Sequence, residues 1–390
     1  MRAMASLVAV SSCLLLLVGS AGAGEGRVLG QERIVAFLYL PKGLDAKGLR
    51  SPTLVHSKPG DWQYWRERGV VPCRGKTWFD LLRSPVPKGV EILTGLDYGG
   101  DPHPVVCIDE FGFDFGGETD RKTATLLRAT RGRRPELGIA VWQMRGPVSP
   151  VLAAAYREVV DLVLVEAYVE GVADYWWIAT QVVAARLQGL MHKTVVGLGL
   201  GIGGRPGERW AASREELERQ VRFVRLVAPE SPGIAFFAAG AKRGEEGLLE
   251  HADRLCAALD EVPADGSGLP PEALELHRTL SREPERPTLV ACGRWAEPNR
   301  SWTNPSKLVE PRTFRLLLLN LGREPARNVA VRLRNPEGKG GEVFARGVAN
   351  VPARGVAAAV LPVVGQWEVW KTWEVELEAP GCEVLVFPRK

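Results

Sequence analysis

Short apolar runs alternate with stretches of helical spacing along the first two thirds of the chain. Apolar runs of this length, bounded by turn residues, are typical of buried strands. We predict strands at residues 34–40, 53–56, 90–96, 105–110, 138–143, 162–168, 194–200 and 234–239. The run from Leu162 to Val165 contains no polar residue, which indicates a strand that is covered on both faces.

The stretches between the later strands have the periodicity of helices. Residues 120–131 and 174–190 place apolar side chains on one face, and a third helix is expected after Ser213, where Glu216 completes a capping box. Alternating strands and helices indicate βαβ units and a parallel sheet, and eight parallel strands can close a barrel. We therefore predict an α/β fold, a (β/α)8 TIM-like barrel.

The pattern changes after residue 262. Residues 263–287 are rich in Pro, Gly, Ser and charged residues, as expected of a linker, with one short helix near residues 272–280. The region beyond alternates apolar and polar positions and predicts a small all-β sandwich domain at residues 288–390. Its expected strands are residues 312–320, 326–334, 355–363, 372–378 and 383–387. The barrel domain then covers residues 24–262.

Two of these strands carry a short motif. The first ends in Asn320-Leu321-Gly322, and the second contains Asn328-Val329. A strand, an Asn-x-Gly turn and a strand opening with Asn-Val resemble the adhesion-type and galactosidase-associated β-sandwich modules. This resemblance implies a compact accessory module after the barrel.

Residues 1–23 have the composition of a signal peptide. Arg2 precedes an apolar run at residues 7–18, and Ala21-Gly22-Ala23 supplies small residues for cleavage. A run of about a dozen apolar residues is too short to span a bilayer. We expect the chain to be exported, either secreted or periplasmic. No later stretch is long and apolar enough for a transmembrane segment.

Composition excludes several classes of function. The chain is 45% apolar and 25% charged, with a net charge of +4, so it is an ordinary globular protein without the charge of a nucleic-acid partner. Its 5 histidines are isolated and its 6 cysteines form no CxxC pair. We therefore predict no metal site and no cofactor. A Cys292–Cys382 disulfide and the oligomeric state are left open.

Acidic residues follow two of the predicted strands. Asp109 and Glu110 end the strand at 105–110, and Glu166 lies near the end of the strand at 162–168. A carboxylate after an apolar run is costly to bury unless it is paired or solvated, and the carboxyl ends of barrel strands form the active site. Glycosidic cleavage needs two carboxyl groups. We predict Glu110 as the proton donor, Glu166 as base or nucleophile, and Asp109 as a third acid.

Other strand ends supply polar and aromatic side chains that suit a sugar. These candidate binding residues are Asp97, Tyr39, His56, Trp142, Gln143 and Tyr168. The glycines between Gly197 and Gly204 lack the Lys-Ser/Thr of a phosphate loop, so we interpret them as points where the backbone closely approaches other groups at the barrel mouth.

The strand ends Ile108-Asp109-Glu110 and Glu166-Ala167-Tyr168 resemble those of barrel glycoside hydrolases, broadly the chitinase-like groups. The chitinase signature Asp-x-x-Asp-x-Asp-x-Glu is absent, because Val105 and Cys107 occupy two of its acidic positions. The resemblance implies an exported glycoside hydrolase acting on a poly- or oligosaccharide. Two alternatives stay open. One is a non-catalytic carbohydrate-binding or scaffold protein, favoured by the lack of an acid at residues 194–200. The other is a different barrel enzyme, such as a lyase, transferase or deacetylase.

Overall fold

The structure, a computed structural model, describes residues 29, 33–40, 48–111, 114–144, 148–203, 209–298, 312–336, 342–364 and 373–387. At residues 110 and 111 it describes the backbone alone. The predicted signal peptide at residues 1–23 lies outside the described residues.

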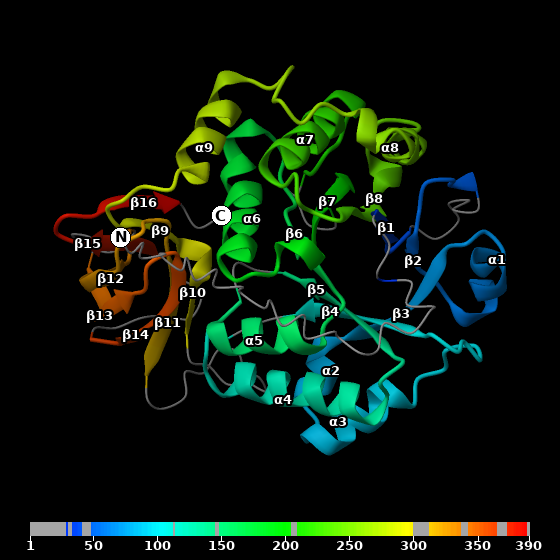
Figure 1. The fold of residues 1–390 in the computed structure, drawn as a ribbon, viewed down its shortest axis with the longest axis horizontal. Helices are drawn as coiled ribbons and strands as arrows, with labels where there is room; N and C mark the ends of the chain where they lie inside the picture. Colours follow the sequence, from blue (N-terminus) through cyan, green and yellow to red (C-terminus); the bar gives the residue numbers. More distant parts are fainter. Residues whose placement is uncertain are drawn as a thin grey trace, which may run out of the picture.

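Eight parallel strands close into a barrel, which confirms the predicted fold class (Figure 1). The barrel closes because β8 pairs with β1 in parallel register, with Val35 opposite Ile234. The strands are β1 (Ile34–Leu38), β2 (Leu54–His56), β3 (Val71–Thr77), β4 (Val105–Phe111), β5 (Gly138–Gln143), β6 (Leu162–Glu166), β7 (Thr194–Gly201) and β8 (Gly233–Gly240).

Helices cover the outside of the barrel. They are α1 (Trp62–Arg66), α2 (Trp78–Leu82), α3 (Val86–Thr94), α4 (Glu118–Arg133), α5 (Pro150–Val159), α6 (Tyr175–Leu187), α7 (Arg214–Val227) and α8 (Leu248–Ala257). The helix expected after Ser213 is α7, and the Ser213 hydroxyl accepts a hydrogen bond from the backbone N–H of Glu216 at 3.2 Å. This N-cap satisfies a backbone donor that the helix itself leaves unpaired.

One predicted strand is wrong. Residues 90–96 were expected to form the third strand, but residues 90–94 lie in α3, which buries Val90 and Leu93 and exposes Glu91. Three-residue spacing of buried side chains is a helical period. The third strand is β3, whose charged residues Arg74 and Lys76 interrupt the apolar pattern. The prediction of eight barrel strands was therefore right, although one of the eight predicted strands was wrong.

The lumen of the barrel is packed with side chains from alternate strand positions. Val105 and Cys107 of β4 lie there with Cys73 of β3 and Ala140 of β5. Because successive residues of a strand point to opposite faces, the next lumen position on β4 is residue 109. The amino-terminal and central lumen is therefore apolar, and polar side chains enter at the carboxyl end.

The remaining strands form a β domain of two sheets. The first contains β9 (Thr288–Cys292), β10 (Ala296–Pro298), β11 (Thr313–Asn320), β14 (Gly355–Pro362) and β16 (Glu383–Phe387), and the second contains β12 (Ala326–Arg334), β13 (Val343–Val351) and β15 (Glu374–Glu378). Strands β9, β10 and β13 were not predicted. One pairing in this domain is parallel, because β16 runs in the same direction as β9.

The Asn320-Leu-Gly322 turn has a clear structural role. The Asn320 side-chain oxygen accepts from the backbone N–H of Gly322 at 2.9 Å and from that of Thr288 at 3.2 Å. Its amide nitrogen donates to the carbonyl of Glu324 at 2.8 Å. A fully buried amide that satisfies these backbone groups fixes the turn between β11 and β12.

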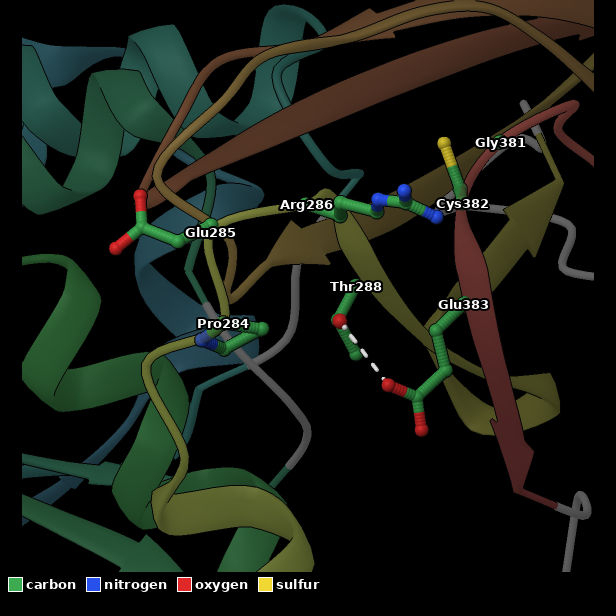
Figure 2. A pocket seen from close by; sticks show the side chains of 7 residues that line it. All are labelled: Pro284, Glu285, Arg286, Thr288, Gly381, Cys382 and Glu383. Atoms are coloured by element: carbon green, nitrogen blue, oxygen red, sulfur yellow. Dashed lines mark hydrogen bonds between the residues drawn. The ribbon is translucent and has the colours of Figure 1, made fainter.

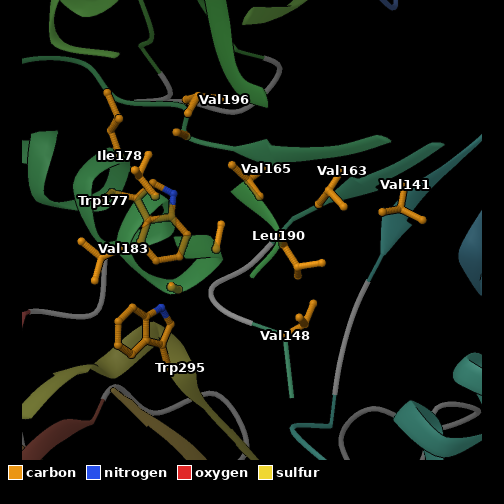
Figure 3. Packing of buried hydrophobic residues seen from close by; sticks show 14 of the residues in the cluster. Val141, Val148, Val163, Val165, Trp177, Ile178, Val183, Leu190, Val196 and Trp295 are labelled. Atoms are coloured by element: carbon orange, nitrogen blue, oxygen red, sulfur yellow. The ribbon is translucent and has the colours of Figure 1, made fainter. Parts of the chain in front are cut away.

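The β domain packs directly on the barrel. Helix α9 (Pro271–Ser281), within the segment expected to be a linker, packs against α6. Figure 3 shows Trp177 of α6 and Trp295 of the β domain in one apolar cluster with Val163 and Val165 of β6. The barrel wall and the β domain therefore share an uninterrupted apolar core.

Two further findings concern the described part of the chain. No helix there is long and apolar enough to cross a membrane. Cys73, Cys107, Cys256, Cys292 and Cys382 are all free thiols, so the Cys292–Cys382 bridge is not formed.

Candidate functional site

Asp109 brings a carboxylate to the barrel mouth, by which we mean the carboxyl ends of the strands. It is in phase with the lumen residues Val105 and Cys107, and it lies opposite Thr77 in the regular pairing of β3 and β4. The pairing of β4 with β5 becomes irregular between Ile108 and Phe111. The side chain of Glu110, the predicted proton donor, lies outside the described residues, so its role stays a prediction.

Tyr39 is the partner of Asp109. Its hydroxyl donates a hydrogen bond to the Asp109 carboxylate across the mouth. Burial, followed by the charge and hydrogen bond of Asp109, raises the pKa of Tyr39 far above its ordinary value, so the phenol stays protonated. Tyr39 has a φ of 53°, in the left-handed region that residues with a Cβ rarely adopt. Such strained backbone is often found at functional sites.

His56 lies beside Tyr39, with 4.6 Å between the ring centroids. A Cβ atom on Gly75 would stand 2.2 Å from His56 Nε2, so the ring occupies space that only glycine leaves open. Burial, and secondarily the charge of Arg74, lowers the pKa of His56 to about 4. The imidazole is therefore neutral at pH 7.

Four more aromatic rings gather at the mouth, and one of them, Phe237, lies 5.5 Å from Tyr39 between ring centroids. Phe237 of β8 lies 5.2 Å from Tyr168, 5.4 Å from Trp210 and 6.4 Å from Trp142, measured between ring centroids. The Trp142 indole N–H donates to the Tyr168 hydroxyl at 3.0 Å. Burial, with the charge of Glu166 second, raises the pKa of Tyr168 well above its ordinary value.

The glycines of β7 make room for these rings. A Cβ atom on Gly197 would lie 2.9 Å from the Trp142 ring, and one on Gly199 would lie 2.6 Å from the Trp210 ring. Both distances are too short for ordinary packing, which confirms that these glycines permit close approach at the mouth.

Glu166 ends β6, in phase with the lumen residues Leu162 and Leu164 and opposite Gly197. It is half-buried, and its backbone carbonyl accepts from the Trp177 indole N–H at 3.0 Å. The predicted pair of Asp109 and Glu166 thus lies on strands two apart in the sheet, with β5 and its Trp142 between them.

Two predicted binding residues lie away from the mouth. Asp97 follows α3 and precedes β4, at the amino-terminal end of the barrel, and its carboxylate accepts from the backbone N–H of Gly99 at 2.8 Å. The sequence analysis expected Asp97 at the mouth because residues 90–96 were read as a strand. Gln143 is next to lumen-facing Trp142, so alternation turns it to the outer face, where it lines a small cavity with Gln181 of α6 and Val165.

The sequence analysis missed Trp210 and Phe237. Phe237 was detectable, because it follows Ala235 by two residues near the end of a predicted strand. Trp210 lies in the segment after β7, and its sequence position does not show that it returns to the mouth. The only sign in the sequence was the group of glycines in β7, which indicates that a bulky side chain packs there.

Two aspartates fasten the loop between β4 and α4. The Asp114 carboxylate accepts from the backbone N–H groups of Thr119 at 2.9 Å and Asp120 at 3.1 Å. The fully buried Asp120 carboxylate accepts from Gly116 at 2.6 Å and Asp114 at 3.1 Å. Burial, followed by the charge of Asp114, raises the pKa of Asp120 to about 7. This reciprocal pair holds the loop that leaves the strand of Asp109.

A hollow lies on the β domain (Figure 2). It has a volume of about 600 Å³ and is lined by Pro284, Glu285, Arg286, Thr288, Gly381, Cys382 and Glu383. The Thr288 hydroxyl donates to Glu383 at 3.3 Å across it. No aromatic side chain lines this hollow, in contrast to the barrel mouth. Among the described residues, no group of three His, Cys, Asp or Glu side chains is arranged to hold a metal ion.

Comparison with known proteins gave structural matches alone. No protein-family model and no curated protein matches the chain. An endo-beta-N-acetylglucosaminidase from Cordyceps militaris is 10% identical, with a TM-score of 0.44 over 60% of this chain and 94% of that one. The catalytic domain of a hyperthermophilic chitinase from Pyrococcus furiosus is 12% identical, with a TM-score of 0.45 over 60% and 96%. The ChiA C-terminal domain of Legionella pneumophila is 12% identical, with a TM-score of 0.41 over 58% and 98%.

Proposed function

We propose that the barrel mouth binds a poly- or oligosaccharide and cleaves a glycosidic bond, with Asp109 as the acid–base group and Glu166 as the second carboxylate. The observation that carries this proposal is the hydrogen bond from Tyr39 to Asp109 in a mouth lined by aromatic rings. Asp109 takes the role that the sequence analysis gave to Glu110, because described contacts connect Asp109 with the mouth.

The chemistry follows from the groups present. Cleavage requires one carboxyl group to protonate the leaving oxygen and a second to act as nucleophile or base. Tyr39 fixes the direction of the Asp109 carboxylate on β4. Glu166 reaches the mouth from β6, two strands away in the barrel. The rings of Tyr168, Trp210 and Phe237 provide apolar surfaces for sugar faces, and a few placed polar groups then give orientation.

A second candidate is carbohydrate binding without cleavage. Strand β4 presents Val105 and Cys107 to the lumen, and β7 contains no carboxylate. A site that stacks a sugar needs the aromatic group but not two acids. This candidate shares the barrel mouth with the first and differs from it in turnover alone.

The test is a glycan panel assayed for both hydrolysis and binding with the mature chain, which begins near Gly24. Asp109→Asn should lower turnover by about 10²- to 10⁴-fold, the contribution of a general acid or base, and leave binding nearly intact. Glu91→Gln is the matched control, since Glu91 forms an exposed pair with Lys88 on α3. Binding without hydrolysis in the wild type would favour the second candidate, and neither activity on any glycan would refute both.

Export is part of the proposal. It rests on the leader-like composition of residues 1–23, which lie outside the described residues. Secreted protein should begin near Gly24 on N-terminal sequencing. Retention of Met1 on exported material would contradict this.

A further inference from the structure

Asp114 and Asp120, here called the aspartate pair, fasten residues 114–117 to the start of α4. Each carboxyl group accepts hydrogen bonds from two backbone N–H groups, at distances from 2.6 to 3.1 Å. The bonding is reciprocal, because each side chain accepts from the backbone N–H of the other aspartate. Neither side chain can therefore move without releasing the backbone of its partner, and the segment closes or opens as one unit.

The pair places two acidic groups in one water-poor site. Asp120 is fully buried and Asp114 is 9% exposed. Among the described residues, neither carboxyl group forms an ion pair with a lysine or an arginine. Two carboxyl groups that share a buried site resist double ionisation, so one proton is retained to a higher pH. Burial, followed by the charge of Asp114, raises the pKa of Asp120 to about 7, although hydrogen bonds from Ser149 and from the backbone N–H groups act in the opposite direction.

Helices α4 and α5 provide the other neighbours within the barrel. Arg121 of α4 donates to a backbone carbonyl of the segment at 3.0 Å, and Glu118 is exposed to solvent. The Ser149 hydroxyl at the start of α5 donates to the carboxyl group of Asp120. Burial, and secondarily the charge of Asp120, raises the pKa of Tyr156 in α5 well above its ordinary value, so its phenol stays neutral. The ionisable group that changes its charge in this cluster near neutral pH is therefore Asp120.

The segment also contacts the β domain. A Cβ atom on Gly116 would lie 3.9 Å from the Cβ atom of Ala358 in β14. A Cβ atom on Gly117 would lie 2.1 Å from Asp114 Oδ2 and 2.9 Å from Arg315 Nη1 in β11. The guanidinium of Arg315 is thus close to Asp114, although the two groups form no ion pair. Residues 114–117 lie where the barrel meets the β domain, so their opening loosens that contact.

We propose that the aspartate pair is a pH-sensitive switch: it holds residues 114–117 closed while it keeps a proton, and the segment opens more often once that proton is lost. Opening exposes Asp120 to water, where a carboxylic acid of this type ionises at about pH 4. Between that pH and about 7, opening therefore releases a proton and becomes more favourable as the pH rises. The switch does not depend on the proposed function.

Amide hydrogen exchange on the mature chain measures this opening without a substrate. The N–H groups of Gly116 and Thr119 donate to the pair. Their protection, relative to an unstructured peptide, should fall by about tenfold between pH 5 and pH 6 and level off above pH 7, because one proton is released on opening. Asp120→Asn cannot ionise, so its protection should be nearly constant over the same range. Constant protection in the wild type would overturn the inference.

Asp253 of α8 provides the control in the same experiment. Its buried carboxylate accepts from the backbone N–H groups of Ser51 at 2.8 Å and Arg50 at 3.0 Å. The protection of the Ser51 N–H should stay constant between pH 5 and pH 7. A parallel fall at Ser51 and at Gly116 would show general loosening of the chain and would also overturn the inference.

A second variant covers the case in which Asp120→Asn does not fold. Asp114→Asn removes the like charge, so Asp120 ionises at lower pH and the fall in protection should begin at lower pH than in the wild type. A pH dependence identical to that of the wild type would refute the coupling of the two carboxyl groups.

Discussion

The Trp142 indole N–H donates to the Tyr168 hydroxyl at 3.0 Å, which ties β5 to the segment that follows β6. Trp142 is almost fully buried, so its N–H cannot turn to water instead. The bond fixes two of the aromatic rings of the mouth relative to each other.

Tyr168→Phe should therefore destabilise the protein by about 1–3 kcal/mol, because a buried N–H donor is left unpaired. Urea unfolding gives the free energy. Trp142→Phe/Tyr168→Phe removes both hydrogen-bonding groups and should cost less than the sum of the two single variants. Strict additivity would show that the bond contributes nothing.

Gly75→Ala should displace His56, since a Cβ atom there would lie 2.2 Å from Nε2. The displaced imidazole becomes more exposed, and its pKa should rise from about 4 toward the ordinary value of about 6.5. An NMR titration of the histidine ring protons reads this directly. Gly60→Ala is the control, because nothing lies within 4 Å of its Cβ position. An unchanged titration of His56 in Gly75→Ala would contradict the packing described.

His56 should make the protein less stable in acid. Its folded pKa of about 4 lies below the unfolded value, so the stability it contributes is complete above pH 6.5 and is lost as the pH falls through about 4. The loss is of the order of 3 kcal/mol. His56→Gln should remove this contribution from the difference between the unfolding free energies at pH 4 and pH 7.

Asp120 should act in the opposite direction. Its folded pKa of about 7 lies above the unfolded value, so its protonated form stabilises the fold below about pH 4 and this contribution is lost as the pH rises through 7. Asp120→Asn should remove that loss. Because the two groups oppose each other between pH 4 and 7, the wild-type profile should be flatter than either variant's. As the pH rises from 4 to 7, the unfolding free energy should decrease in His56→Gln, where Asp120 alone acts, and increase in Asp120→Asn, where His56 alone acts.

Phe387 should stabilise the packing of the β domain on the barrel. Its ring stacks on Trp176 with 5.3 Å between centroids and 4° between planes. Phe387→Ala should cost about 2–4 kcal/mol, because it removes a large apolar contact. Val386→Ala is the control, since Val386 is 41% exposed. Equal losses for the two variants in urea unfolding would argue against a stabilising stack.

The fold class was predictable because buried parallel strands are uniformly apolar. Strand β3 was not, because Arg74 and Lys76 occupy its outward positions and the short apolar run of α3 imitates a strand. Over so few residues, the apolar run that contains Val90 and Leu93 fits both the helical period and the strand period. Alternation lets only one of Asp109 and Glu110 face the lumen, and the structure was needed to put Asp109 in phase with Val105 and Cys107. The proposal prefers Asp109 to Glu110 because of its contact with Tyr39.

Strand β9 lies between β11 and β16, and β16 pairs with it in parallel from near the end of the described residues. During synthesis on the ribosome, β9 must therefore remain an open sheet edge until residues 383–387 have emerged. Unpaired edges recruit other chains. The ring of Trp176 stays uncovered over the same interval, although the barrel that carries it has already been made. A nascent chain stalled before this point would expose both surfaces to chaperones and proteases, so the emergence of β16 is the step that covers them.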